Sequence, residues 1–233
     1  MQQESCVVLF SGGLDSTTAL GWALARYERV FALIFDYGQR HRIELRAAAR
    51  TARRLGVPRA VLKVDLRPLG GSALTDPKIP LPRCRRRSDI RPGPPATYVP
   101  FRNGIFLSLA AAWAEARGIQ DIVCGFNVID SPDYPDTRPQ FVRAMERAVR
   151  AGTRAAYGAP PIRILAPFAG LKKSDIIRLG LSLGVDYSTA VSCYAGTEAP
   201  CGRCSACLLR REAWREAGEK DHLEVRLKKE GRR

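Results

Sequence analysis

The chain has 233 residues, 45% of them hydrophobic, which is enough for one substantial core and a small appendage. Its 38 Lys and Arg residues outnumber 23 Asp and Glu residues, and the formal charge of +15 is compatible with an anionic partner or with a solvated basic surface. The amino terminus lacks a signal-peptide pattern, and no apolar run approaches the roughly 18 residues of a membrane span. We therefore expect a soluble cytoplasmic protein.

Short β-branched runs alternate along the chain with longer segments that carry apolar residues at helical spacing. This order predicts an α/β fold with a mainly parallel sheet. The expected strands cover residues 5–10, 30–38, 60–66, 121–127 and 162–168. The expected helices cover residues 15–27, 42–56, 103–118 and 138–153. The proline-rich residues 67–101 fit neither pattern, so we expect a long loop that closes over a site at the carboxyl ends of the strands.

The turn between the first strand and the first helix, SGGLDST at residues 11–17, has the composition of an anion-binding loop. Gly12 and Gly13 let the backbone approach a ligand closely, and the helix points its unpaired N–H groups at the same place. Asp15 could hold a divalent cation or cap the helix. A capped turn without a ligand is the alternative interpretation, and the Gly-Lys-Ser/Thr of a Walker A loop is absent. The hydroxyl donors for phosphate oxygens are Ser11, Ser16 and Thr17.

The second expected strand ends in FDYGQRH, residues 35–41, at the edge where open α/β sheets bind ligands. Four of these side chains offer hydrogen-bonding and stacking groups beside the first loop. His41 could act in proton transfer, although a lone histidine at a helix start is more often a structural hydrogen-bonding group. The four residues are Tyr37, Gln39, Arg40 and His41.

Four cysteines crowd together near the carboxyl terminus. Two overlapping C-x-x-C pairs and one upstream thiolate can wrap a tetrahedral ion, which favours a closed structural zinc site over its rival, an iron–sulfur cluster. Four protein ligands leave no open position for a catalytic water, so we expect the metal to fix the carboxyl-terminal segment. The expected ligands are Cys193, Cys201, Cys204 and Cys207.

The SGGLDS sequence resembles the PP-loop of ATP pyrophosphatases, which cleave ATP between the α and β phosphates. That resemblance implies a Rossmann-like parallel sheet of the adenine nucleotide alpha hydrolase type, here with a small carboxyl-terminal zinc-binding segment. From about Val7 to Gly218 the chain resembles the 7-cyano-7-deazaguanine synthase (QueC) family. Besides the two loops described above, the matching segments are GGSALTD, TYVPFRN, IFLSLAAAWAE, YPDTRPQF, LKKSDIIRLGLSLGVDYS, SCYAG and CGRCSACLLR.

The QueC resemblance implies an ATP-dependent ligase that uses Mg²⁺ and ATP to adenylate the carboxylate of 7-carboxy-7-deazaguanine. The acyl group passes to ammonia as an amide, which is then dehydrated to a nitrile. The implied ATP-binding residues are Phe10, Ser11, Gly12, Gly13, Leu14, Asp15, Ser16 and Thr17, with Asp15, Ser16 and Lys173 as catalytic residues. The implied substrate and nucleotide pocket comprises Tyr37, Gln39, Arg40, His41, Arg102, Asn103, Asp130, Tyr134, Asp136 and Arg138.

We also expect a homodimer, a nucleotide-binding domain at residues 1–187, and a zinc-binding segment with a basic tail at residues 188–233. Phe101 stands where the QueC family usually has glycine, and residues 131–133 form a changed turn, so we expect an altered pocket wall. One alternative is a QueC-like protein of an antiviral defence operon that joins the activated deazaguanine to an amine of a partner protein, which the basic loop 83–91 would contact. A PP-loop tRNA-modifying enzyme and a zinc-ribbon nucleic-acid-binding module are further alternatives.

Overall fold

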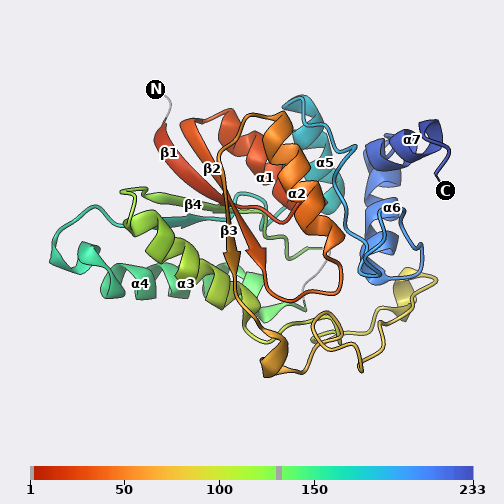
Figure 1. The fold of residues 1–233 in the computed structure, drawn as a ribbon, viewed down its shortest axis with the longest axis horizontal. Helices are drawn as coiled ribbons and strands as arrows, with labels where there is room; N and C mark the ends of the chain where they lie inside the picture. The colour runs from red at the N-terminus through yellow and green to blue at the C-terminus, as the bar shows by residue number, and fades with distance from the viewer. Residues whose placement is uncertain (1–2, 130–132, 233) are drawn as a thin grey trace.

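The computed structural model describes residues 3–129 and 133–232, and its centre is a parallel sheet of five strands (Figure 1). The strands run in the order β3-β2-β1-β4-β5, and every neighbouring pair is parallel. This is the arrangement of a doubly wound, Rossmann-like sheet, and it confirms the predicted fold class. The strands are β1 Gln3–Leu9, β2 Tyr27–Asp36, β3 Arg59–Lys63, β4 Asp121–Cys124 and β5 Arg163–Leu165.

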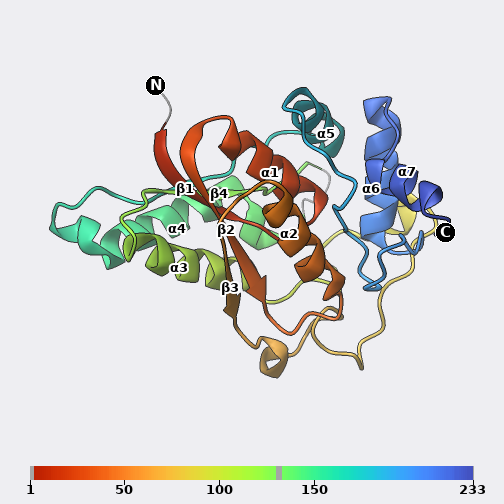
Figure 2. The ribbon, with the colours of Figure 1, turned by 45° about the horizontal axis from the view of Figure 1, so that its top comes forward.

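Helices cover both faces of the sheet (Figures 1 and 2). Side chains alternate along β1, so that Cys6 and Val8 join the core under α1, α2 and α5, while Val7 joins the core under α3 and α4. The second half of the central strand, residues 6–9, is therefore apolar, as cover on both faces requires, whereas its first residues Gln3, Glu4 and Ser5 are polar. The helices are α1 Leu14–Leu24, α2 Ile43–Arg54, α3 Arg102–Glu115, α4 Pro139–Gly152, α5 Lys173–Ser182, α6 Ser205–Ala217 and α7 His222–Lys229.

The proline-rich residues 67–101 form the long loop that the sequence predicts, with only the 3₁₀ turns η1 Arg67–Leu69 and η2 Arg87–Asp89 inside it. The loop leaves β3 and reaches the base of α6 (Figures 1 and 2), where the Cys84 N–H donates to the carbonyl oxygen of Arg203 at 2.6 Å. Two further 3₁₀ turns are η3 Pro135–Thr137 and η4 Arg154–Tyr157.

Helix α6 lies against α5 and shares the main core (Figure 2). Helix α7 instead contributes Leu223 and Leu227 to a small separate cluster with Ala47 and Val191. Trp214 of α6 packs edge to face on Tyr187, with ring centroids 5.4 Å apart. A buried ion pair joins the two helices, since the Arg210 guanidinium donates to both carboxylate oxygens of Asp221 at 2.5 and 2.8 Å. Among the described residues, no helix has the length and apolarity that crossing a membrane would require.

Candidate active site

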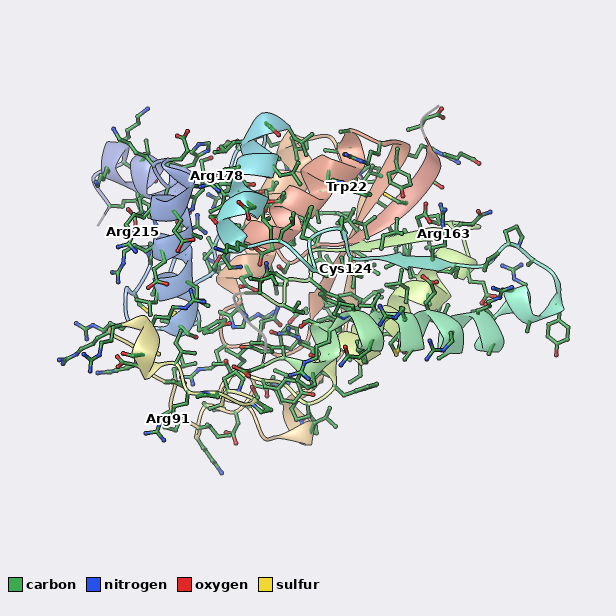
Figure 3. The ribbon with its side chains drawn as sticks, turned by 180° about the vertical axis from the view of Figure 1, so that it is seen from behind. Trp22, Arg91, Cys124, Arg163, Arg178 and Arg215 are labelled. Atoms are coloured by element: carbon green, nitrogen blue, oxygen red, sulfur yellow. The ribbon has the colours of Figure 1, made fainter. Side chains whose placement is uncertain are left out.

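A cavity of about 310 Å³ opens at the carboxyl ends of β1, β2 and β4. The amino-terminal ends of α1, α3 and α5 also reach it, and α6 closes one side. Cys124 at the end of β4, labelled near the centre of Figure 3, lies in its wall. The strand order reverses at β1, with β2 and β3 on one side and β4 and β5 on the other, and open α/β sheets bind ligands in the crevice at such a point.

The first loop packs tightly against its neighbours, and glycines at the contacts leave no room for a side chain. Gly12 has a φ of +80°, and a Cβ there would lie 2.6 Å from the Ala48 nitrogen and 2.7 Å from the Glu44 carbonyl oxygen, both in α2. On the other side, a Cβ on Gly125 would lie 2.7 Å from the carbonyl oxygen of Asp15. The loop is therefore clamped between α2 and the end of β4.

The hydroxyl groups of the loop turn back on its own backbone. Ser16 and Thr17 each donate to the Gly13 carbonyl oxygen, at 3.1 and 2.7 Å, and the Ser11 and Ser16 Oγ atoms are 3.0 Å apart. Helix α1 has no side-chain cap, so its first N–H groups and its positive dipole end point into the cavity region. This is the geometry of an anion-binding nest. Thr17 and Gly12 shape the loop but do not line the cavity.

An ion pair joins the first loop to α5. Lys173 Nζ lies 2.5 Å from Asp15 Oδ2, and both side chains line the cavity. The other carboxylate oxygen, Asp15 Oδ1, is buried without a hydrogen-bond partner among residues 3–129 and 133–232. An orphaned carboxylate oxygen beside a phosphate-binding loop fits a hard divalent cation such as Mg²⁺.

The opposite end of the cavity is aromatic. The Arg102 guanidinium lies over the rings of Tyr37 and Phe106, 5.6 and 5.9 Å from their centroids, and donates to the Tyr37 hydroxyl at 3.3 Å. Burial raises the pKa of Tyr37, and burial raises that of Tyr194 well above its usual range, so both hydroxyls stay protonated. Tyr134 completes this end, with its hydroxyl 2.9 Å from Thr97 Oγ1. Flat rings and a guanidinium suit a planar heterocycle that carries an anionic group.

Gln39 and His41 line the cavity between these two ends, whereas Arg40 does not. Gln39 braces the turn after β2, because its amide accepts from the Tyr37 N–H at 2.8 Å and donates to the Phe35 carbonyl oxygen at 3.1 Å. Arg40 points outward and donates to the carbonyl oxygens of Ala73 and Ile79 in the long loop. It therefore anchors that loop.

The segment around residue 136 supports the cavity more than it lines it. Asp136 is buried, and its Oδ2 accepts from the Asn103 N–H at 2.9 Å, which caps the start of α3. Arg138 is exposed at the N-cap of α4 and does not line the cavity. Asp130 lies outside the described residues. Of the expected pocket residues, those at the cavity are Tyr37, Gln39, His41, Arg102, Asn103 and Tyr134.

Phe101 does not line the cavity, so it does not form the part of the pocket wall that was expected of it. Residues 131 and 132 of the changed turn lie outside the described residues. Phe101 is the one described residue other than glycine with a positive φ, 52°, and the residue is 52% exposed. Its ring packs edge to face on Phe141 and covers Gly104, where a Cβ would lie 2.4 Å from the ring. Phe101 therefore acts on the fold from outside, at the start of α3.

The four clustered cysteines bring their sulfur atoms within 4.8 Å of one another. The Cys201 and Cys207 sulfurs are 3.9 Å apart, close to the roughly 3.8 Å edge of a tetrahedron with Zn–S bonds of about 2.3 Å. Hydrogen bonds from its neighbours hold the pKa of Cys193 far below the usual thiol range, while the contact with Cys193 raises the pKa of Cys204 to about 11. All four can ionise together only around a cation, so the residues present fit Zn²⁺.

The family model described as Queuosine biosynthesis protein QueC matches residues 5–218. The chain belongs to the QueC family. It is 46% identical to 7-cyano-7-deazaguanine synthase of Pseudomonas fluorescens (strain SBW25), over 95% of this chain and 98% of that relative. It is 48% identical to 7-cyano-7-deazaguanine synthase of Thermoplasma acidophilum, over 96% of this chain and 93% of that relative. Among solved structures, it is similar to NMN synthetase from Francisella tularensis, with a TM-score of 0.49, 15% identity, and coverage of 99% of this chain and 79% of that one.

Sequence reasoning did not single out several residues that line the cavity of this QueC family member. Glu44 stands one helical turn after His41, Tyr194 directly follows Cys193, and Arg210 follows the last cysteine. Their positions in the sequence, close to predicted site residues, could have identified these three residues as candidates. The further lining residues that were missed include Thr97, Phe106, Cys124, Asn127, Ser192 and Leu209.

Proposed function

We propose that this protein is an ATP-dependent carbon–nitrogen ligase that adenylates the carboxylate of 7-carboxy-7-deazaguanine and converts it with ammonia, by way of an amide, to 7-cyano-7-deazaguanine. The observation that carries the proposal is one cavity with two unlike ends, an anion-binding loop and an aromatic chamber with a guanidinium. Such a cavity can hold ATP phosphates and a flat carboxylated heterocycle side by side. Membership of the QueC family and the names of its relatives support the same reaction.

At the phosphate end, the N–H groups of the first turn of α1 bind phosphate oxygens of ATP. Lys173, held by Asp15, places a positive charge where pyrophosphate leaves. Asp15 Oδ1 would hold Mg²⁺, which neutralises part of the pyrophosphate charge when bound. The protein contributes position and electrostatic stabilisation, and the acyl-adenylate carries the leaving group.

At the aromatic end, the deazapurine ring lies among the tyrosine and phenylalanine rings. The Arg102 Nε is buried without a hydrogen-bond partner within the described ranges, so this N–H is a donor available to the substrate carboxylate. The guanidinium thereby directs the carboxylate toward the phosphate end, where adenylation takes place.

The zinc site would fix one wall of the same cavity. Cys193, Cys201, Cys204 and Cys207 would be the ligands, with Cys204 at the N-cap of α6. Zn²⁺ held by four sulfurs supplies folding energy rather than a bound water. Tyr194, directly after the first ligand, and Arg210, in the helix that follows the last, both line the cavity. Metal binding therefore orders residues that meet the substrate.

Exchange of labelled pyrophosphate into ATP tests adenylation directly. We expect exchange that depends on 7-carboxy-7-deazaguanine and on Mg²⁺ and that needs no ammonia. Exchange without the deazaguanine, or none with it, would overturn the proposal.

Four further expectations from the sequence are predictions that accompany this proposal. They are the division into residues 1–187 and 188–233, a homodimer, a cytoplasmic location, and, as the alternative acceptor, an amine of a partner protein in place of ammonia. Light scattering tests the dimer. An acyl product that forms only when a partner protein is added would favour the alternative.

A further inference from the structure

His41 and Glu44 form a buried pair at the start of α2. The His41 Nε2 lies 3.2 Å from Glu44 Oε2, and both side chains line the cavity. The other ring nitrogen, Nδ1, is buried and has no hydrogen-bond partner within residues 3–129 and 133–232. A carboxylate beside Nε2 favours the proton on that nitrogen, which leaves the Nδ1 lone pair unused.

The pair lies between the two ends of the cavity. The Glu44 backbone packs against Gly12 of the first loop, whereas the His41 ring lies edge to face with Tyr37 and Tyr194, 6.4 and 5.9 Å between centroids. The carbonyl carbon of an acyl-adenylate joins the heterocycle to the α-phosphate. His41 therefore lies in the middle part of the cavity, where we expect that carbonyl carbon to bind.

Few other groups at the cavity can accept a proton. Burial raises the pKa of Tyr37, of Tyr194 and of the Cys124 thiol, so these groups stay protonated. One oxygen of Asp15 is paired with Lys173, and the other is the oxygen that would hold Mg²⁺ in the proposed function. Apart from Glu44, which faces Nε2, this leaves His41 Nδ1 as the ring nitrogen at the cavity without a partner among the described residues.

We propose that His41 Nδ1 is the proton acceptor for the nitrogen nucleophile in amide formation and that Glu44 positions the imidazole. The inference rests on the proposed function. The lone pair of ammonia attacks the acyl carbon, a C–N bond forms, and the C–O bond to AMP breaks with its electron pair going to the phosphate oxygen. One proton of the attacking nitrogen passes to Nδ1, and the Glu44 carboxylate stabilises the resulting imidazolium.

The test measures adenylation and amide formation separately in a His41→Asn variant. Asparagine is chosen because it keeps a polar group near the position of Nδ1 but accepts no proton. We expect ammonia-dependent amide formation to fall about 100-fold more than pyrophosphate exchange falls. Hydroxylamine, which is mostly uncharged at neutral pH and needs less help from a base, should restore acyl transfer in the variant. Glu44→Gln should show the same pattern with a smaller loss.

His222→Asn is the matched control, because His222 is the only other histidine of the sequence and does not line the cavity. Equal losses of exchange and amide formation in His41→Asn, or unchanged amide formation, would overturn the inference. If that variant does not fold, the same comparison in Glu44→Gln decides. An unaltered protein that shows no exchange would instead overturn the proposed function itself, so the two failures are distinguishable.

Discussion

Asp15 and Lys173 show how single charges define the phosphate end of the site. They are 158 residues apart in the chain, yet Lys173 Nζ lies 2.5 Å from Asp15 Oδ2. The start of α5 and the start of α1 bring them together beside the anion-binding loop. The ion pair leaves one Asp15 oxygen without a partner among the described residues, and in the proposed function it directs the lysine to the phosphates of ATP.

Asp15→Asn should lower substrate-dependent pyrophosphate exchange at least about 100-fold, because the amide can neither hold a cation well nor fix the lysine. Asp175→Asn is the control, since Asp175 lies in the first turn of α5 but pairs with Arg178 outside the cavity. Exchange rates at saturating ATP measure both variants. Near-normal exchange in a folded Asp15→Asn protein would refute the role of the pair.

Helix α3 depends on an unusual residue at its start. Phe101 adopts left-handed backbone angles, and the Tyr98 hydroxyl accepts a hydrogen bond from its N–H at 3.0 Å. The position requires a conformation that glycine adopts without strain, which explains why the QueC family pattern has glycine there. The phenylalanine ring offsets the strain by packing on Phe141.

Phe101→Ala should therefore destabilise the protein, because it removes the ring and keeps the strained backbone. Phe101→Gly should be more stable than Phe101→Ala by about 1 kcal/mol, since it removes the strain as well. Urea unfolding of the two variants measures the difference. Both should keep pyrophosphate exchange within about twofold, and a selective loss of exchange would contradict a role outside the cavity.

Helix α6 links the cysteine cluster to the cavity, so the metal should affect activity through the fold. Cys204→Ser should lower the zinc content to background and weaken the wall that carries Arg210. Cys84→Ser is the control, because Cys84 is buried nearby but outside the cluster. Metal analysis measures the zinc content of both variants, and pyrophosphate exchange measures their activity. Zinc retained in Cys204→Ser, or lost equally in Cys84→Ser, would exclude the proposed ligand set.

Over the whole molecule, the sequence predicted the sheet well, and most residues of the predicted anion-binding loop line the cavity. All five strands and the first four helices were expected, because alternating apolar runs identify a parallel sheet and its crossover helices. The loop at residues 11–17 was predicted because its residues are contiguous. No helix was expected at residues 205–217 or 222–229, where the cysteine motif and the charged residues conceal the apolar positions. Trp214 packs on distant Tyr187, and Leu223 and Leu227 pack in a cluster with Ala47 and Val191.

The aromatic end was predicted only in part, because side-chain direction in loops depends on tertiary packing. Arg40 and Asp136 belong to matching segments, yet one anchors the long loop and the other caps α3. Glu44 and Tyr194 were missed because they meet His41 only after the chain folds. The sequence motifs identified the segments that surround the cavity, and the fold determined which of their side chains line it.

The most direct test of the account is mass spectrometry of the products after incubation with ATP, Mg²⁺ and 7-carboxy-7-deazaguanine, with and without ammonium. With ammonium, we predict 7-cyano-7-deazaguanine together with AMP and pyrophosphate, and an amide at early times. Without ammonium, we predict the adenylate alone. An unchanged deazaguanine, or an amide that never becomes a nitrile under either condition, would contradict the synthase reaction proposed for this cavity.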